Sequence, residues 1–111
     1  MLAKILGLNK GALQEEEVKK RIKGKTAELI DVRRAMEFRM GHLTPCVNID
    51  IKEPDFEKKI NLYDRDKTYI LYCQSGRRSA KAKRKMKKMG FNSVYCLKGG
   101  FKKWDGPLRL K

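Results

Sequence analysis

The sequence of 111 residues lacks any long apolar segment. A helix that spans a bilayer needs about 20 consecutive apolar residues, whereas the N-terminal stretch Met1–Leu8 is interrupted by Lys4 and followed by Asn9 and Lys10. We therefore expect neither a transmembrane helix nor a secretory signal peptide, and no membrane partner. A chain of this length has room for one domain with one modest core.

Cysteine and histidine are both scarce. The three cysteines, Cys46, Cys73 and Cys96, stand at wide spacings without a C-x-x-C pair, and His42 is the only histidine. An odd number of separated cysteines argues against a disulfide framework and against a zinc site, so we expect no metal and no cofactor. The expected compartment is the reducing cytoplasm, where a lone cysteine is either a small core residue or a reactive thiol.

Acidic residues are almost missing from the last third of the chain. Residues 1–76 hold 15 basic and 12 acidic side chains, whereas residues 77–111 hold 13 basic side chains and one acid, Asp105. The formal net charge of +15 therefore comes mostly from this last third. Such an excess attracts anionic ligands and partners but carries no information about the fold.

Apolar periodicity divides the chain into alternating helices and strands. The patterns predict helices over residues 14–22, 35–40, 56–62 and 80–89, extended segments over 27–32, 46–51, 68–73 and 93–97, and a short amphipathic turn over 101–104. The segment 68–73 is apolar on both faces, which is typical of a central strand. Strands that alternate with helices through short links predict a parallel sheet with helices on both faces.

The residue with the strongest chemical signal is Cys73, at the end of that central strand. Ligands of parallel α/β folds bind at the carboxyl ends of the strands. The turn that follows Cys73 contains a glycine and precedes a helix for which Ser79 is the expected N-cap, so its backbone N–H groups form an anion-binding nest. This setting lowers the pKa of a thiol and favours a nucleophilic thiolate. The residues expected to cradle an anionic substrate are Gln74, Ser75, Gly76, Arg77, Arg78 and Ser79.

Four segments in order resemble the single-domain rhodaneses, the thiosulfate sulfurtransferase family. The loop Cys73–Ser79 (C-Q-S-G-R-R-S) is similar to their active-site loop. The other three segments are Leu29-Ile30-Asp31-Val32-Arg33, Glu37-Phe38 with Gly41-His42-Leu43, and Gly99-Gly100-Phe101-Lys102-Lys103-Trp104. The likeness spans residues 13–105, with one departure, Pro45-Cys46 where the family usually has Gly-Ala.

The resemblance implies a rhodanese-like α/β/α fold with a central five-stranded parallel sheet, formed by residues 13–111 after an N-terminal extension of residues 1–12. It also implies a sulfurtransferase in which Cys73 takes the outer sulfur of thiosulfate as a persulfide and passes it to cyanide, a thiol or a protein acceptor. Asp31 and Arg33 are expected to support the loop or to pair with each other. Gly99-Gly100 is expected to let the chain pass close to the mouth of the site.

Three alternatives stay open at this point. A cysteine phosphatase or arsenate reductase has an arginine six residues after the cysteine, where this chain has Ser79. A Cys–His dyad would rest on His42 alone, which is more simply a hydrogen-bonding turn residue. The unrelieved basic residues of helix 80–89 indicate a sulfur-relay or binding module that docks an acidic protein or tRNA, although without interleaved aromatic residues specific nucleic-acid recognition is not favoured.

Overall fold

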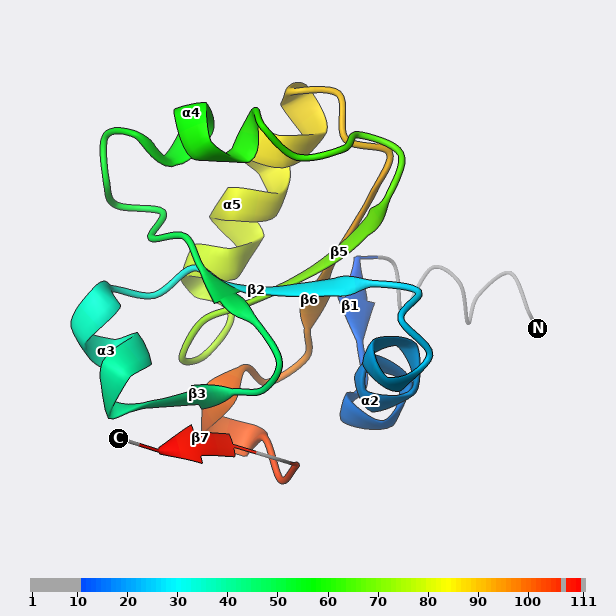
Figure 1. Cartoon of the computed structure of the whole chain (residues 1–111), viewed down its shortest axis with the longest axis vertical. Coiled ribbons are helices and arrows are strands. Elements are labelled where there is room, and N and C mark those ends of the chain that lie inside the picture. Colours follow the sequence, from blue (N-terminus) through cyan, green and yellow to red (C-terminus); the bar gives the residue numbers. More distant parts are fainter. Residues whose placement is uncertain (1–10, 107, 111) are drawn as a thin grey trace.

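A computed structural model of the chain describes residues 11–106 and 108–110 (Figure 1). Most of the expected N-terminal extension, residues 1–10, lies outside the described residues. Within them, no helix is long and apolar enough to cross a bilayer. The elements follow in the order β1 (Ala12–Leu13), α2 (Glu15–Lys23), β2 (Glu28–Asp31), α3 (Ala35–Met40), β3 (Gly41–Leu43), β4 (Val47–Asn48), α4 (Phe56–Ile60), β5 (Thr68–Tyr72), α5 (Arg77–Lys88), β6 (Ser93–Leu97), the 3-10 helix η1 (Phe101–Lys103) and β7 (Leu108–Leu110).

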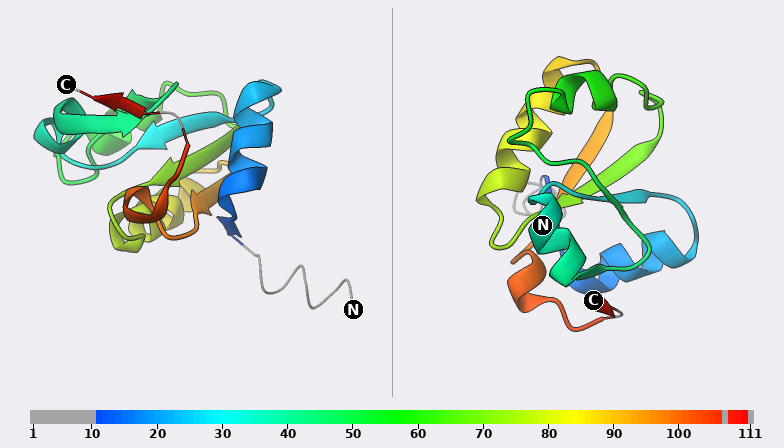
Figure 2. Two further views of the ribbon diagram at one scale, coloured as in Figure 1. Left: turned by 90° about the horizontal axis from the view of Figure 1, so that it is seen from below. Right: turned by 60° about the vertical axis from the view of Figure 1, so that its left-hand side comes forward.

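The fold is built on a five-stranded parallel sheet with the strand order β1-β6-β5-β2-β4. Helices α4 and α5 cover one face, and α2 with η1 covers the other (Figures 1 and 2). The expected α/β/α architecture with a five-stranded parallel sheet is therefore confirmed. The central strand β5 lies between β6 and β2, so its carboxyl end opens in the middle of one edge of the sheet.

Alternating side chains of β2 and β5 fill two separate cores. On β5, Tyr69 and Leu71 pack toward α4 and α5 with the buried Met86, whereas Ile70 and Tyr72 pack toward α2 with Val18. All four β5 side chains are fully buried, which explains the apolar run without a polar face. Because the period of a strand is two, Tyr72 and the following Cys73 point into different layers.

The charges at the ends of α2 and α5 differ. In α2 three glutamates occupy the first turn and three basic residues the last turn, an arrangement that complements the helix dipole. In α5 the first turn holds Arg77 and Arg78 and no acid. Two cations at a helix N-terminus oppose the dipole, so α5 must be stabilised there by contacts from elsewhere in the chain.

Most predicted elements are found within two residues of their expected ends, but the start of α5 was predicted wrongly. The helix begins at Arg77, not Ala80, because Gly76 adopts a left-handed conformation (φ 117°) and its carbonyl accepts the first helical hydrogen bond, from the Ala80 N–H at 3.0 Å. Ser79 is thus a buried residue of the first turn and not the N-cap. Strand β1 and the antiparallel pair of β3 with β7 were not predicted, since these strands are only two or three residues long.

Candidate active site

Cys73 lies directly after β5, where the chain turns into α5. Its side chain is buried, with 1% of the residue exposed, and its sulfur faces the N-terminus of α5. The Gly76 N–H and the Ser79 N–H donate hydrogen bonds to Sγ over 3.1 and 3.3 Å. The Ser79 hydroxyl oxygen lies 3.7 Å from the same sulfur. The loop therefore curls around the sulfur as the sequence predicts, with backbone donors directed at it.

These donors determine the ionisation of the thiol. Burial raises the pKa of Cys73, but hydrogen bonds from the backbone and hydroxyl of Ser79 and from the backbone of Gly76 and Ser75 outweigh it, so the pKa is lowered from its ordinary value. In the thiol form the Ser79 hydroxyl donates to the Gly76 carbonyl at 3.1 Å. To stabilise the thiolate, that hydroxyl must turn toward the sulfur. The thiolate is the nucleophilic form of cysteine, so the loop favours the reactive species.

The lowered pKa predicts how reactivity follows pH. In a Cys46→Ser/Cys96→Ser background, the rate of alkylation of Cys73 by iodoacetamide should fall only as the pH drops through a midpoint below the ordinary thiol value of 9.0. Ser79→Ala should move that midpoint upward because it removes one donor, whereas Ser75→Ala, which keeps the backbone donor, should not. A wild-type midpoint at or above 9.0 would contradict the assigned hydrogen bonds.

The turn after β6, from Gly99 to Lys102, holds the Cys73 loop through backbone hydrogen bonds. The Phe101 N–H donates to the Cys73 carbonyl at 2.8 Å, and the Lys102 N–H donates to the Gln74 carbonyl at 3.1 Å. Gly100 has a φ of 65°, and a Cβ atom there would lie 2.7 Å from the Cys73 carbonyl oxygen and 2.6 Å from that of Gln74. The prediction that Gly99-Gly100 lets the chain pass close to the site is confirmed, and Gly100 is the residue that makes the contact.

Substitution of the two glycines should separate backbone strain from contact with the loop. Both residues have positive φ, but the atoms nearest to a Cβ at Gly99 are side-chain carbons of Lys103, at 3.1–3.3 Å, and not backbone atoms of the loop. Gly100→Ala should therefore lower the free energy of unfolding in urea by about 1–3 kcal/mol more than Gly99→Ala, because backbone atoms of the loop must move. It should also slow reaction of Cys73 by roughly tenfold or more. Equal losses in the two variants would show that the loop contact has no influence.

The two arginines of the loop have different surroundings. Arg78 makes a two-pronged ion pair with Glu37 of α3, with N–O distances of 2.7 and 3.1 Å. The Arg78 side chain is the main reason that the pKa of Glu37 is lowered to about 2. Glu37 also accepts a hydrogen bond from the Arg34 N–H at the start of α3. Glu37 thus both caps α3 and compensates a cation at the start of α5, whereas Arg77 is exposed, as are Gln74 and Ser75.

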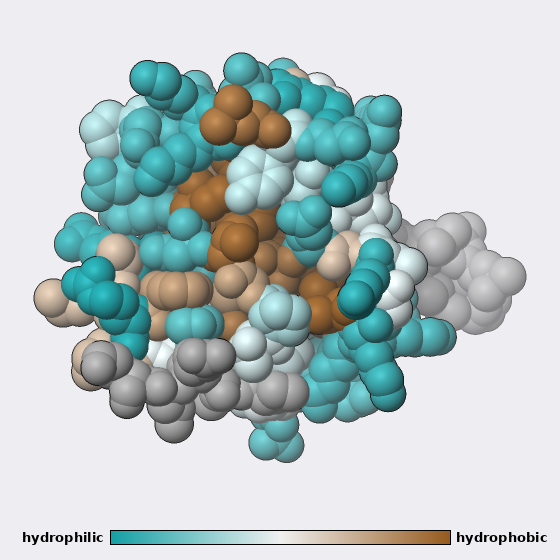
Figure 3. Space-filling model, in the orientation of Figure 1, coloured by the Kyte–Doolittle hydropathy of each residue, from teal (hydrophilic) through white to brown (hydrophobic). Residues whose placement is uncertain are grey.

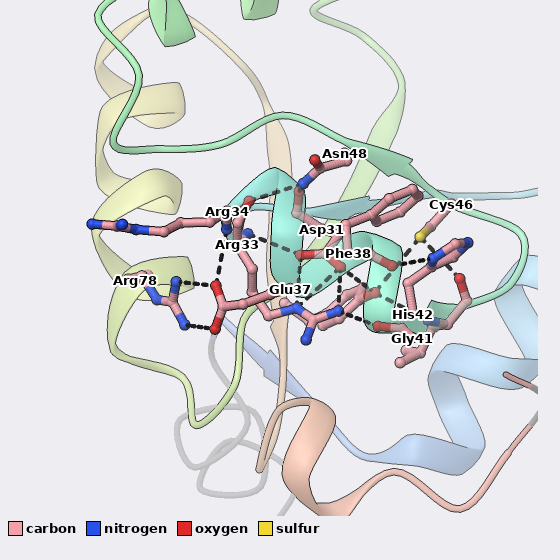
Figure 4. A network of polar contacts seen from close by, with 12 residues as sticks. Asp31, Arg33, Arg34, Glu37, Phe38, Gly41, His42, Cys46, Asn48 and Arg78 are labelled. Carbon is pink, nitrogen blue, oxygen red and sulfur yellow. Dashed lines mark hydrogen bonds and ion pairs between the residues drawn. The ribbon is translucent and has the colours of Figure 1, made fainter. Parts of the chain in front are cut away.

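Asp31 and Arg33 form a buried ion pair beside the loop (Figure 4). Arg33 Nη2 lies 2.8 Å from Asp31 Oδ2 and also donates to the Gly41 carbonyl at 2.7 Å. The Tyr72 hydroxyl donates to the same carboxylate at 2.6 Å and accepts from the Leu43 N–H at 3.0 Å. The Arg33 guanidinium stacks 4.3 Å from the centre of the Phe101 ring. Sequence reasoning anticipated the pair but missed Tyr72, which comes from β5, 41 positions beyond Asp31.

His42, Cys46 and Cys96 lie in surroundings that differ from those of Cys73. His42 Nδ1 is 2.7 Å from the Phe38 carbonyl, and its ring stacks on Phe38 at 3.6 Å, as expected of a hydrogen-bonding turn residue. Cys46 is half-buried and donates to the Leu43 carbonyl at 2.9 Å, and burial raises its pKa to about 12. Burial also raises the pKa of Cys96 on β6. Among the described residues, no cluster of three or more acidic, histidine or cysteine side chains is arranged to hold a metal ion.

Comparison with known proteins places this geometry in a family. A Bacillus subtilis protein named "Uncharacterized protein YqhL" is 40% identical over 99 residues, which are 89% of this chain and 75% of that protein. The B. subtilis "Putative sulfur carrier protein YrkF" is 40% identical over 79 residues, 70% of this chain and 41% of that protein. A tRNA uridine(34) hydroxylase of Buchnera aphidicola is 30% identical over 104 residues, 89% of this chain. The chain spans only 33% of that hydroxylase.

A solved structure and a family model identify the family. The crystal structure of a rhodanese-related protein from Thermoplasma volcanium superposes with a TM-score of 0.79 at 27% identity, over 90% of this chain and 98% of that one. The model of the rhodanese-like domain matches residues 14–106. The match covers most of the sequence, and it includes the cysteine loop between the central strand and the helix that follows it. The chain therefore belongs to the rhodanese-like sulfurtransferase family.

Proposed function

We propose that the protein moves sulfane sulfur from thiosulfate, or from another persulfide donor, to a thiol or cyanide acceptor through a persulfide on Cys73. The observation that supports this most directly is the pair of backbone N–H donors, Gly76 and Ser79, directed at Sγ from the N-terminus of α5. They stabilise a thiolate before the reaction and an anionic persulfide after it. Gln74, Ser75, Arg77 and Arg78 complete the cationic and polar surroundings in which the anionic donor would bind.

The first half of the reaction is a displacement at sulfur. The Cys73 thiolate attacks the outer sulfur of thiosulfate, the S–S bond of thiosulfate breaks, and sulfite leaves with the electron pair. The product is a Cys73 persulfide anion with one additional sulfur atom. No proton transfer is needed because the attacking group is already a thiolate, so the absence of a histidine contact with Cys73 among the described residues is no obstacle.

The second half regenerates the enzyme. A thiolate or cyanide acceptor attacks the outer sulfur of the persulfide, the new S–S bond breaks, and the Cys73 thiolate leaves with the electron pair. Gly76 and Ser79 stabilise this leaving group with the same two N–H donors. Neither half changes the total charge or requires an oxidant, a metal or an organic cofactor.

Incubation with thiosulfate tests this function. The intact mass of the full chain should increase by one sulfur atom, and cyanide should remove that atom and yield thiocyanate. An aryl phosphate offered in parallel should not be hydrolysed, because Ser79 stands where phosphatase loops have an arginine. A protein that gains no cyanide-labile sulfur would exclude the proposed reaction, and turnover of the aryl phosphate would instead support the phosphatase alternative.

The second candidate function is a sulfur-relay or binding module that docks an acidic protein or tRNA. The observation that favours it is the exposed basic surface of α5, in which Lys81, Arg84, Lys87 and Lys88 are exposed while Ala82 and Met86 face the core. Only Lys85 among the lysines of α5 has an acidic partner in the described part of the chain, Glu57 at 3.1 Å. If tRNA is the partner, its affinity should fall steeply with salt, and less steeply after charge reversal of Lys83, Arg84 and Lys87.

A further inference from the structure

Helix α3 presents a surface that the fold itself does not use. None of its six residues is buried, and its two methionines, Met36 and Met40, stand four positions apart with 67% and 69% of each residue exposed. Residues four apart share one face of a helix. The space-filling view shows moderately hydrophobic surface over α3, at the left, apart from the more strongly hydrophobic band at the centre (Figure 3).

This methionine face lies beside the mouth of the Cys73 site. Met36 and Met40 line one groove together with Gln74, the residue that follows Cys73, and Phe101 of η1. The ion pair between Glu37 and Arg78 holds α3 against the first turn of α5. Cys73 is almost completely buried, and Gln74 next to it in the chain lines this groove, so a macromolecule bound there would hold its thiol beside the Cys73 loop.

The border of the groove is positively charged. Arg34 lines the groove, and four more exposed basic residues lie within three positions of a lining residue along the chain, whereas the one carboxylate that lines it, Glu37, is already paired with Arg78. These basic residues are Arg34, Arg39, Arg77, Lys102 and Lys103. A methionine-rich apolar centre with a cationic rim fits a partner with an apolar centre and an acidic rim.

The aromatic residues around the groove argue for a protein and against RNA. Single-stranded nucleic acid is bound by aromatic rings whose faces are open to bases. Phe101 is half-buried, packed on the Arg33 guanidinium and stacked with Tyr72 at a centroid distance of 6.3 Å. Phe38 is stacked with His42. Each ring is thus already engaged by a side chain of this protein, whereas flexible methionines adapt readily to protein side chains.

We propose that Met36, Met40 and the groove between α3, Gln74 and Phe101 form the docking surface for an acidic protein that exchanges sulfur with Cys73 through a thiol. The sulfur exchange at this surface rests on the proposed function, whereas binding of the acidic partner does not. Small acceptors such as cyanide need no such surface, so the methionines should matter for a peptide-borne thiol and not for cyanide.

The test uses the full chain and two synthetic peptides. Each peptide places one cysteine among leucines, and the flanking residues are glutamates in one peptide and lysines in the other. Binding is measured by fluorescence anisotropy with peptides in which serine replaces the cysteine. Sulfur transfer is measured with the cysteine peptides, as the rate at which they discharge the Cys73 persulfide relative to the rate of discharge by cyanide. The variant is Met36→Gln/Met40→Gln, and the matched control is Leu62→Gln, because Leu62 is another hydrophobic residue, 85% exposed, outside the groove.

The proposal predicts that the glutamate peptide binds more tightly than the lysine peptide and discharges the persulfide faster. Met36→Gln/Met40→Gln should lower both the affinity for the glutamate peptide and its discharge rate by roughly tenfold. Leu62→Gln should change neither. Equal behaviour of the two peptides, or of the two variants, would overturn it. A competition experiment with unfractionated tRNA could also overturn the proposal. It would do so if tRNA displaced the peptide from the wild type and bound the methionine variant more weakly than the wild type. If thiosulfate adds no sulfur to Cys73, the proposed function fails, and anisotropy still decides the docking surface.

Discussion

Replacement of Cys73 by serine should abolish uptake of sulfur from thiosulfate, with a rate reduced by at least about a thousandfold, because the variant has no thiolate to form a persulfide. The hydroxyl of serine is not ionised at neutral pH, although the Gly76 and Ser79 N–H groups can still hydrogen-bond to it. The fold should therefore persist while the chemistry is lost. Intact mass after thiosulfate treatment gives the measurement, and unfolding in urea verifies the fold.

The other two cysteines provide matched controls for this experiment. Burial raises the pKa of both Cys46 and Cys96, so each is a protonated thiol at neutral pH and a poor nucleophile. Cys46→Ser and Cys96→Ser should take up sulfur within about threefold of the wild-type rate. The Cys96 thiol interacts with the Ser79 side chain, but neither substitution removes the Gly76 and Ser79 N–H donors to Cys73. Equal uptake by the Cys73→Ser variant and the wild type would transfer the assignment to one of these two residues.

Replacement of Asp31 by alanine should lower the free energy of unfolding by about 3–5 kcal/mol. The substitution leaves Arg33, of which 2% is exposed, as a buried charge without its carboxylate, and it removes the acceptor of the Tyr72 hydroxyl. This loss is a large fraction of the roughly 5–15 kcal/mol that stabilises a typical domain. Urea unfolding of both proteins measures it directly.

Two further variants distinguish a buried charge from a lost contact. Asp31→Leu/Arg33→Met removes both charges and should recover most of the stability, because no unpaired ion stays in the core. Glu57→Ala breaks the exposed pair with Lys85 and should cost at most about 1 kcal/mol. A cost for Asp31→Ala as small as that of Glu57→Ala would mean that water reaches Arg33 and that the buried pair stabilises the fold no more than an exposed one.

Local sequence patterns were sufficient to predict β5 and α5 on either side of the Cys73 loop but not the residue at which α5 begins. The apolar run of β5 and the basic helix after it are both visible in the sequence, and so is Cys73 between them. The start of α5 was predicted at Ala80 because serine is a preferred N-cap residue, whereas the helix begins at Arg77 and has two arginines in its first turn. Glu37, 41 positions before Arg78, offsets one of them, and no pattern within a helical window contains that information.

The contacts of the Asp31–Arg33 pair were predictable only in part for the same reason. Asp31 and Arg33 are two residues apart on one strand, so their pairing is a local inference. Tyr72 and Phe101 reach that pair from other strands and turns, and their contacts exist only because β5 lies beside β2 and η1 closes over the edge of the sheet. Contacts of this kind depend on topology, which the resemblance to a family supplied and residue periodicity did not.

The ion pair between Glu37 and Arg78 also joins the methionine face to the helix whose N–H groups hold the sulfur. Linkage is reciprocal: if a docked partner changes the free energy of the persulfide state through this pair, the persulfide must change the affinity of the partner by the same factor. A sulfur-loaded and an empty enzyme would then differ in how strongly they retain the same partner. Because the pKa of Glu37 is about 2, this connection stays ionised at any pH at which a cell would use it.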